Sequence, residues 1–219
     1  FFNHEITTKP DGTFVTEAEE KSLDISQMDY EKVKYYDVGK KIHPRFPQQK
    51  KLSAVKPRLI DLIDAIEKYC LSKKKNPIKY SIAIKIAPEE STTCDILSES
   101  FIEKITTIIK EKKIESRVII QSFNIQTLKY IHQHHPAIAT ALLIDEGDKK
   151  SYAIQLKELG FIPDIYSPHF SLVTPLLVKQ CQDMNVRLIP WLVNEASTFE
   201  MLKKIGVNGM ITDYPPKGL

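Results

Sequence analysis

The sequence has few of the residues that mark metal-rich or membrane proteins. Its three cysteines, Cys70, Cys94 and Cys181, lack the paired spacing of a zinc site, and one would be left over beside any single disulfide. We expect them to pack as small apolar side chains. Apolar runs such as residues 139–144 are far shorter than the roughly 20 residues of a membrane span, so no transmembrane segment is expected.

Basic blocks and glycine-rich loops are also scarce. The formal net charge is only +3, and the charges are well mixed, without a stripe of arginines interleaved with aromatics, so a nucleic-acid partner is not expected. None of the 7 glycines forms a Gly-x-Gly-x-x-Gly turn between a strand and a helix. The sequence therefore lacks the best marker of a dinucleotide-binding fold. The chain has no initiator Met and no signal sequence, which leaves compartment and export open.

Short β-branched runs alternate with longer amphipathic segments from residue 80 onward. The pattern predicts strands at residues 80–86, 117–122, 140–144, 163–167, 187–191 and 209–213. It predicts helices between them, at residues 97–112, 125–134, 149–159, 172–183 and 197–205. Such alternation indicates parallel strands with right-handed crossovers, either in an open doubly wound sheet or in most of an eight-stranded barrel.

We expect residues 1–219 to form a single domain, since the chain is 42% hydrophobic. Residues 1–56 are rich in turn formers and charges, which indicates an irregular excursion with short helices, for example at residues 27–35. Helical periodicity returns at residues 57–66, with Pro57 suited to a first turn. Residues 57–219 are therefore predicted to hold one helix followed by six strand-helix units.

Two of the predicted strands end in side chains that can carry chemistry. Trp191 ends one strand and Asp213 ends the next. In barrels of repeated strand-helix units the active site lies at the carboxyl ends of the strands, so both side chains would lie at one mouth. Packing and helix capping are the alternative roles for a Trp and an Asp at such positions.

Four segments together resemble the glycerophosphodiester phosphodiesterase family. They are Gln121-Ser122-Phe123, Asp164-Ile165-Tyr166-Ser167-Pro168, Pro190-Trp191 and Thr212-Asp213-Tyr214-Pro215. The resemblance implies an α/β fold of the TIM-barrel type with six of its eight strand units in this chain. It also implies a metal-dependent hydrolase that, when complete, converts glycerophosphodiesters to glycerol 3-phosphate and an alcohol, with Mg²⁺ or Ca²⁺ as cofactor.

The chain departs from this family in two places. It contains none of the three motifs of the family's first two strand units, which are His-Arg-Gly, Glu-x-Asp and His-Asp. Residues 1–7 resemble the segment that follows the His-Asp motif in the family. The third strand reads Ser81-Ile82-Ala83-Ile84-Lys85 where the family usually has Asn-x-Glu-x-Lys. Ala83 thus replaces a metal-binding Glu, and a methyl group cannot coordinate a hard cation, so metal binding by this chain is doubtful.

The resemblance and the strand positions predict four substrate-binding residues, but they identify no catalytic residue with certainty and no metal ligand. The set is Lys85, Gln121, Trp191 and Asp213. Lys85 would pair with a phosphoryl oxygen, and its alternative role is an ion pair with Asp213. His169 follows a strand end and is a further candidate for contact with a ligand. His132, His134 and His135 cluster at a helix end, where they are expected to be solvated or to satisfy the helix dipole and not to be ligands.

Two hypotheses of function remain open from the sequence. The chain is either part of a glycerophosphodiester phosphodiesterase that acts only with its N-terminal strands, or a non-catalytic relative that serves as a phosphate-ligand-binding or scaffold module. Ala83 discriminates between them, because the loss of a metal ligand is a chemical change within the sequence. Head group and oligomeric state leave no signal in the sequence.

Overall fold

The computed structural model describes residues 2–85 and 95–215, with residues 95–98 as backbone only. Its contacts divide the chain into two compact units, Phe1–Asn76 and Pro77–Leu219. The expectation that residues 1–219 form one domain stays a prediction.

The first unit is the turn-rich excursion that the sequence predicts. Its elements are α1 (Glu17–Glu20), the 3₁₀ helix η1 (Ile25–Gln27), α2 (Tyr30–Val33) and α3 (Leu59–Ser72). The single helix expected at residues 27–35 was wrong, because Met28 has an extended backbone that separates η1 from α2. The core of this unit includes Phe2, which stacks on Tyr36 with ring centroids 4.3 Å apart.

The second unit contains a five-stranded parallel sheet. Its strands are β1 (Tyr80–Ala83), β2 (Val118–Ser122), β3 (Ala139–Ile144), β4 (Ile165–Pro168) and β5 (Arg187–Leu188). Their order in the sheet is their order in the sequence, β1-β2-β3-β4-β5. A doubly wound sheet would reverse direction at a switch point, whereas a barrel winds one way. The sheet therefore has the topology of a TIM-type barrel, which confirms the fold class.

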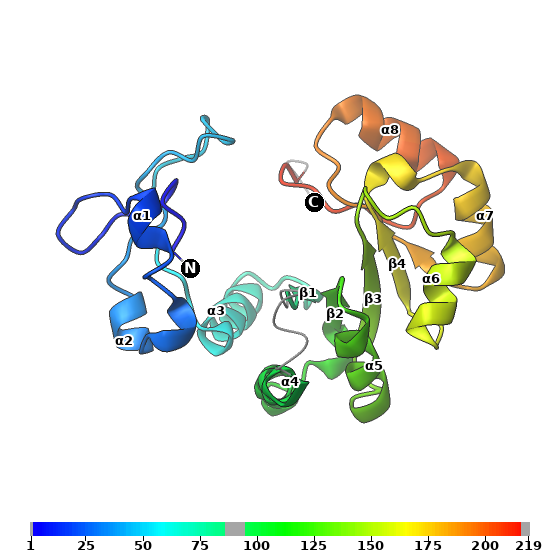
Figure 1. Ribbon diagram of the computed structural model, residues 1–219, viewed down its shortest axis with the longest axis horizontal. Coiled ribbons are helices and arrows are strands. Elements are labelled where there is room, and N and C mark those ends of the chain that lie inside the picture. Colours follow the sequence, from blue (N-terminus) through cyan, green and yellow to red (C-terminus); the bar gives the residue numbers. More distant parts are fainter. Residues whose placement is uncertain (1, 86–94, 216–219) are drawn as a thin grey trace. The chain divides into compact units, whose positions relative to one another are not determined.

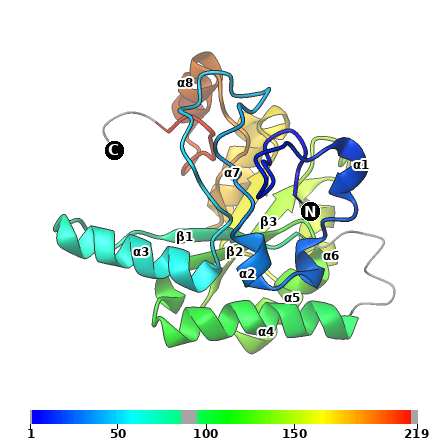
Figure 2. The ribbon, with the colours of Figure 1, turned by 90° about the vertical axis from the view of Figure 1, so that its left-hand side faces the viewer.

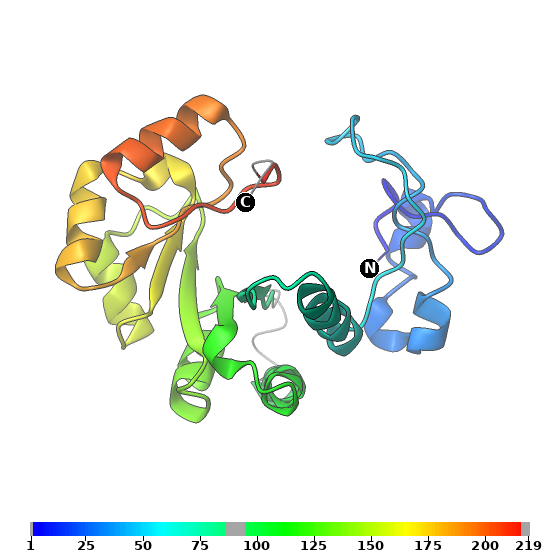
Figure 3. The ribbon, with the colours of Figure 1, turned by 180° about the vertical axis from the view of Figure 1, so that it is seen from behind.

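The helices of this unit pack on one face of the sheet (Figures 1 and 3). They are α4 (Asp95–Glu111), α5 (Ile125–His134), α6 (Tyr152–Leu159), α7 (Pro175–Asp183) and α8 (Ala196–Ile205), with 3₁₀ turns at Glu115–Arg117 and Phe170–Leu172. Alternate strand residues, among them Leu142, Tyr166 and Leu188, join α5, α6 and α7 in one buried cluster. The opposite face of the sheet is the one that faces the interior of a barrel.

Two predicted strands end early in the structure, whereas β2, β3 and β4 differ from their predicted bounds by one or two residues. The first ends at Ala83 rather than at residue 86, and residue 86 lies outside the described residues. The fifth ends at Leu188, although Trp191 still donates its backbone N–H to Pro168 O. Pro190 has no N–H for the ladder, which explains the early end.

The strand predicted at residues 209–213 does not form in the described part of the chain. Its segment nevertheless lies along β5 and continues the sheet through isolated bonds. Ile211 N–H donates to Pro190 O at 2.9 Å, and Val193 N–H donates to Ile211 O at 2.8 Å. The sixth strand unit is thus present as an extended segment without a regular ladder.

Three helices start later than the sequence pattern predicts. The helix expected from residue 57 begins at Leu59 with Arg58 as its N-cap residue, so Pro57 precedes the helix and does not lie in its first turn. The other two begin after a residue whose side chain caps the helix. Ser151 caps α6, so this helix begins at Tyr152 and not at residue 149. Thr174 caps α7 and Pro175 occupies the first helical position, where its missing N–H costs nothing. The apolar pattern before Pro175 belongs to the 3₁₀ turn Phe170–Leu172.

Candidate functional site at the carboxyl end of the sheet

Lys85 and Gln121 lie on the face of the sheet that carries no helix. Ala83 pairs in register with Gln121, and Ile84 N–H donates to Gln121 O at 2.9 Å, so the alternation continues past the end of β1. Ile84 is buried against the helices, whereas Ala83 and Lys85 are exposed. The period-two prediction for this strand is therefore confirmed.

Trp191 lies at the same end of the sheet, beyond β5. Its indole N–H donates to Ser167 O at 3.0 Å, which fixes the ring against β4. The ring makes edge contacts with Phe123, 5.5 Å away between centroids, and with His169, 5.3 Å away. His169 also forms an isolated parallel bridge with Trp191. The carboxyl ends of β2, β4 and β5 thus meet in one aromatic cluster, defined here as Phe123, His169 and Trp191.

The aromatic cluster shows that the sheet is curved. Phe123 follows β2 and Trp191 follows β5, and these strands are three steps apart, a distance of about 14 Å in a flat sheet. Side chains on a flat sheet stand roughly perpendicular to it and could not bring their rings to 5.5 Å. The face that carries Lys85 and Gln121 is therefore concave, as in a barrel.

Asp213 is held by a side chain of the preceding loop. Asn194 donates from Nδ2 to Asp213 Oδ2 at 2.9 Å and accepts the Asp213 backbone N–H at Oδ1, also at 2.9 Å. Thr212 Oγ1 donates to the same amide oxygen at 3.2 Å. Within the described residues no ion pair joins Asp213 to Lys85, so the structure does not form the internal pair that was the alternative role of this lysine.

A cavity of about 320 Å³ opens beside Asn194. Its walls come from the loop before α8, the first turns of α8 and the segment along β5. The lining residues are Val193, Asn194, Glu195, Ala196, Phe199, Glu200, Thr212 and Tyr214. Sequence reasoning missed this cavity, because its two walls are far apart in the chain and neither carries a recognised motif.

The residues present do not fit a divalent cation. Ala83 offers only a methyl group, and across the described ranges 2–85 and 95–215 no three His, Cys, Asp or Glu side chains gather as a metal-binding group. Hard cations require several oxygen ligands.

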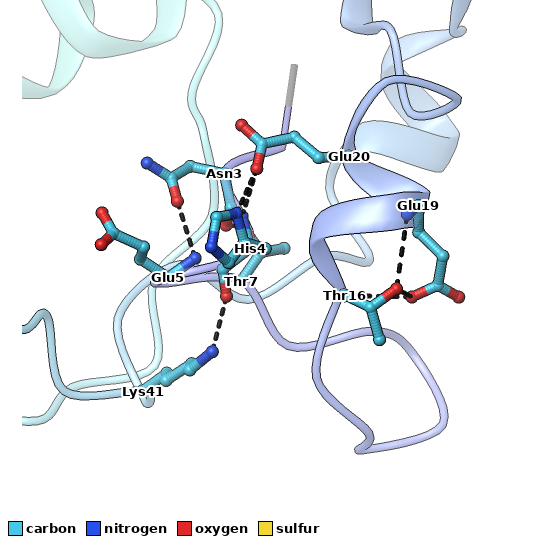
Figure 4. Close-up of polar contacts among 8 residues, drawn as sticks. All are labelled: Asn3, His4, Glu5, Thr7, Thr16, Glu19, Glu20 and Lys41. Carbon is cyan, nitrogen blue, oxygen red and sulfur yellow. Dashed lines mark hydrogen bonds and ion pairs between the residues drawn. The ribbon is translucent and has the colours of Figure 1, made fainter.

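In the first unit, His4 belongs to a polar network that organises a turn (Figure 4). Its ring Nδ1 pairs with Glu20, and its backbone N–H donates to the same carboxylate at 3.2 Å. The hydrogen bond from His4 lowers the pKa of the Glu20 carboxyl. Lys41 Nζ donates to His4 O. These bonds join the chain start to α1 and to the loop after α2, which is a structural role.

The histidines at the end of α5 differ from the expectation in one case. His135 is 5% exposed, not solvated, and its Nε2 lies 2.7 Å from Glu103 Oε1. This hydrogen bond lowers the pKa of the Glu103 carboxyl, and Tyr130 donates to the same oxygen at 2.9 Å. Figure 2 shows α4 beside α5, so the bonds tie these two helices together. His132 and His134 are exposed, as expected.

The cysteines pack as predicted where the structure describes them. Cys70 and Cys181 are free and buried, and Cys94 lies outside the described residues. Burial raises the pKa of the Cys181 thiol. In the described helices, none is both long and apolar enough to cross a membrane.

The one-way parallel sheet, with its helices on one face and its polar and aromatic side chains at the carboxyl ends, defines an α/β barrel-type protein. The model of the glycerophosphoryl diester phosphodiesterase family matches residues 5–217. The chain therefore belongs to this family, whose members are generally dependent on divalent metals.

Relatives of known sequence support the same family. A glycerophosphodiester phosphodiesterase of Caldanaerobacter subterraneus subsp. tengcongensis is 34% identical over 113 residues, which are 52% of this chain and 45% of that protein. One from Bacillus subtilis is 24% identical over 184 residues, or 84% of this chain and 60% of that one. The chain thus matches about half of the length of these relatives.

Solved structures share the fold. The structure of a Silicibacter pomeroyi DSS-3 protein assigned to the glycerophosphoryl diester phosphodiesterases superposes with a TM-score of 0.82 at 23% identity, covering 98% of this chain and 73% of that one. A phosphodiesterase of Oleispira antarctica, solved with the product sn-glycerol-3-phosphate, gives a TM-score of 0.62 at 18% identity, covering 87% and 69%.

Proposed function

We propose that the protein containing this chain hydrolyses glycerophosphodiesters to glycerol 3-phosphate and an alcohol, and that this chain contributes the substrate-binding end of the barrel. The observation that carries the proposal is the family match over residues 5–217, in a chain whose Lys85, Gln121 and Trp191 share one end of the sheet. The product bound to the Oleispira protein supports glycerol 3-phosphate as the part of the substrate to test first.

Each of the four residues has a role that suits its surroundings. Lys85 is exposed and has no ion pair within the described residues, so its ammonium group is available to a phosphoryl oxygen. Gln121, one strand away, would donate to the same phosphate. Trp191 would give the glycerol carbons an apolar wall, since Ser167 holds its ring in place. Asp213 would accept a glycerol hydroxyl.

General acid-base catalysis and a divalent cation, Mg²⁺ or Ca²⁺, would complete the reaction. We assign neither to the described residues, because Ala83 carries no donor atom and no donor group gathers among them. In this proposal the catalytic histidines and the metal-binding carboxylates belong to residues outside this chain. The chain itself binds and orients the substrate.

Binding is tested on the chain as it stands. We expect Lys85→Ala to weaken glycerol 3-phosphate binding about tenfold, because an ammonium-phosphate hydrogen bond between charged groups is lost. Lys157→Ala is the matched control, since Lys157 is an exposed lysine on α6. NMR titration of the amide signals of residues 83–85 and 121–123 measures both affinities. Equal weakening by both variants would exclude a specific role for Lys85.

Hydrolysis is tested on a longer form that carries any residues of the protein that precede Phe1. We expect release of glycerol 3-phosphate from glycerophosphocholine or glycerophosphoethanolamine, abolished by a chelator. If the longer form binds glycerol 3-phosphate but releases none from either diester, the hydrolase proposal fails and the phosphate-binding module takes its place.

A further inference from the structure

A stretch of the first unit departs from the even mixing of charge along the chain. Residues 38–60 contain no Asp or Glu, although the whole chain has 28 of them. Seven Lys and Arg residues lie in this stretch, namely Lys40, Lys41, Arg45, Lys50, Lys51, Lys56 and Arg58. The first five belong to residues 39–52, defined here as the basic loop. Positive charge is thus concentrated in one segment between α2 and α3.

The basic loop has a closed base and its own internal hydrogen bonds. Leu52 N–H donates to Gly39 O at 3.1 Å, so the two ends of the loop lie side by side. A methyl group at Gly39 would lie 2.0 Å from Leu52 O, which leaves room only for glycine. Inside the loop, Phe46 N–H donates to His43 O at 2.9 Å. These are the features of a compact Ω-loop, and Figures 1 and 3 show it extending beyond α1 and α2.

Three cations of the basic loop have no anionic partner within the described residues. They are the exposed side chains of Arg45, Lys50 and Lys51. The other two are engaged inside the unit, since Lys40 pairs with Asp37 at 3.6 Å and Lys41 donates to His4 O. Cations that are not neutralised by neighbours produce a positive potential, which attracts an anionic surface.

Aliphatic side chains are exposed among and beside these cations. The exposed fraction is 42% for Ile42, 57% for Leu52 and 41% for Val55. Cations next to exposed apolar side chains are typical of peripheral membrane binding, in which the cations contact lipid phosphates and the apolar groups enter the acyl boundary.

The same residues are less suited to nucleic acid. Proteins that bind single strands stack bases on aromatic side chains and use arginine freely. The basic loop contains one arginine, Arg45, and one aromatic residue, Phe46, whose ring packs edge-on against His43 with centroids 5.0 Å apart. Aliphatic side chains offer no stacking platform, so the chemistry of the loop favours lipid.

We propose that the basic loop docks the protein on membranes that carry anionic phospholipids. Arg45, Lys50 and Lys51 contact the lipid phosphates, and Leu52 inserts at the acyl boundary. The contact is peripheral and reversible, because each Lys or Arg near an anionic surface contributes a modest attraction that salt weakens. The proposal goes beyond the proposed function and uses no residue of the second unit.

Sedimentation with vesicles tests the proposal on the 219-residue chain. We expect the chain to bind vesicles of equal parts phosphatidylglycerol and phosphatidylcholine at low salt, and not vesicles of phosphatidylcholine alone. The triple variant Arg45→Gln, Lys50→Gln and Lys51→Gln should bind the anionic vesicles about 100-fold more weakly, because three attractions are lost. The charge-keeping triple variant Arg45→Lys, Lys50→Arg and Lys51→Arg should bind like the unmodified chain.

Another run of lysines in the same unit provides the matched control. Lys73→Gln, Lys74→Gln and Lys75→Gln together remove three exposed charges at the end of α3. We expect them to weaken binding no more than about threefold, since charges away from the contact are largely screened. Equal weakening by the two glutamine triple variants would overturn the assignment to the basic loop. Failure of the unmodified chain to bind anionic vesicles would overturn the proposal itself.

Leu52→Ser discriminates between lipid and nucleic acid. We expect it to weaken binding to anionic vesicles about tenfold, because an apolar contact is lost. Leu71→Ser is the control, since Leu71 is 79% exposed on α3, and it should keep the affinity. An unchanged affinity of Leu52→Ser would contradict insertion and overturn the assignment to lipid. Binding of a DNA oligonucleotide as tightly as the vesicles would also overturn it and identify the loop as a nucleic-acid surface.

Discussion

Asp37 is a buried residue of the first unit, and its two carboxylate oxygens accept three hydrogen bonds. It accepts the backbone N–H groups of Gly39 and Lys40 at 2.9 and 2.8 Å, and the Ser53 hydroxyl at 2.5 Å. Burial raises its pKa, but these hydrogen bonds outweigh burial and lower the pKa to about 2. The carboxylate thus connects the loop after α2 with the returning strand-like segment at Ser53.

This lowered pKa predicts acid sensitivity of the first unit. The folded pKa lies below the unfolded value of about 3.9, so the stabilisation is fully present above about pH 4 and is lost as the pH falls towards 2. Asp37→Asn should cost about 2 kcal/mol at pH 7 and remove the acid dependence that Asp37 contributes. Urea unfolding, followed by the NMR signals of Gly39 and Lys40, measures this.

Asp29→Asn is the matched control for Asp37. Asp29 is exposed, caps α2 without a side-chain hydrogen bond, and Asn is an equally good capping residue. We expect a change below about 0.5 kcal/mol. A comparable loss in both variants would show that the bonds to Asp37 do not stabilise this unit specifically.

At the scale of single residues, the sequence predicted the direction of side chains better than their hydrogen-bond partners. The alternation of Ala83, Ile84 and Lys85 follows from strand geometry, so their faces could be assigned from the sequence. The pair of His135 and Glu103 could not, because the two residues are 32 positions apart and only the packing of α5 on α4 brings them together. The carboxylate-amide pair of Asp213 and Asn194 was missed for the same reason.

At the scale of elements, the carboxyl ends of α6 and α8 were predictable because a glycine directly follows each helix. Glycines at the ends of α6 and α8 have left-handed backbones, with φ of 80° at Gly160 and 92° at Gly206. Strand ends were less predictable, because Pro190 ends β5 early and hydrogen-bond partners decide where a ladder stops. The strand expected at residues 209–213 has suitable residues but only isolated bonds to β5.

Gly206 offers a test of one helix end. A methyl group at Gly206 would meet its first neighbour, Gln182 Nε2, at 3.8 Å, so Gly206→Ala adds backbone strain without a clash. We expect a loss of about 1–2 kcal/mol, the cost of a left-handed backbone for an L-residue. Urea unfolding followed by the fluorescence of Trp191, the only tryptophan, measures it.

Gly209→Ala is the control that separates the backbone strain expected at Gly206 from other effects of replacing a glycine. Its backbone is not left-handed, and an added methyl group would lie 3.7 Å from Ile189, an ordinary contact. We expect little change in the free energy of unfolding. Equal losses at both positions would contradict the role assigned to the backbone of Gly206.

At the scale of the whole molecule, the alternation of strands and helices was sufficient to predict a parallel sheet, and the absence of a glycine-rich phosphate loop favoured the barrel. The sequential order of the five strands and the curvature shown by Phe123 and Trp191 agree with that prediction. The cavity beside Asn194 could not be predicted, since its walls meet only after the segment along β5 folds back on the loop before α8.

Activity depends on parts that the described residues do not supply. A positioned acid or base contributes about 10²- to 10⁴-fold in rate, and a metal contributes several kcal/mol of transition-state stabilisation besides. We therefore expect the 219-residue chain alone to release no measurable glycerol 3-phosphate from glycerophosphocholine with Mg²⁺ or Ca²⁺. Ala83→Glu alone should not restore release, because one carboxylate on the concave face makes neither a metal site nor an acid-base pair.

Restoration should require two changes together. A fusion that adds the N-terminal strands of a family member should release little glycerol 3-phosphate while Ala83 is kept, and Ala83→Glu in that fusion should raise chelator-sensitive release about 100-fold or more, since a metal ligand is regained. Ala83→Gln in the fusion is the control, because it adds a similar volume with a neutral and weaker oxygen ligand. Robust chelator-sensitive release by the unmodified chain would contradict this prediction and show that other residues hold the metal. Equal rates with Ala, Gln and Glu at position 83 would show that this position does not bind the cation.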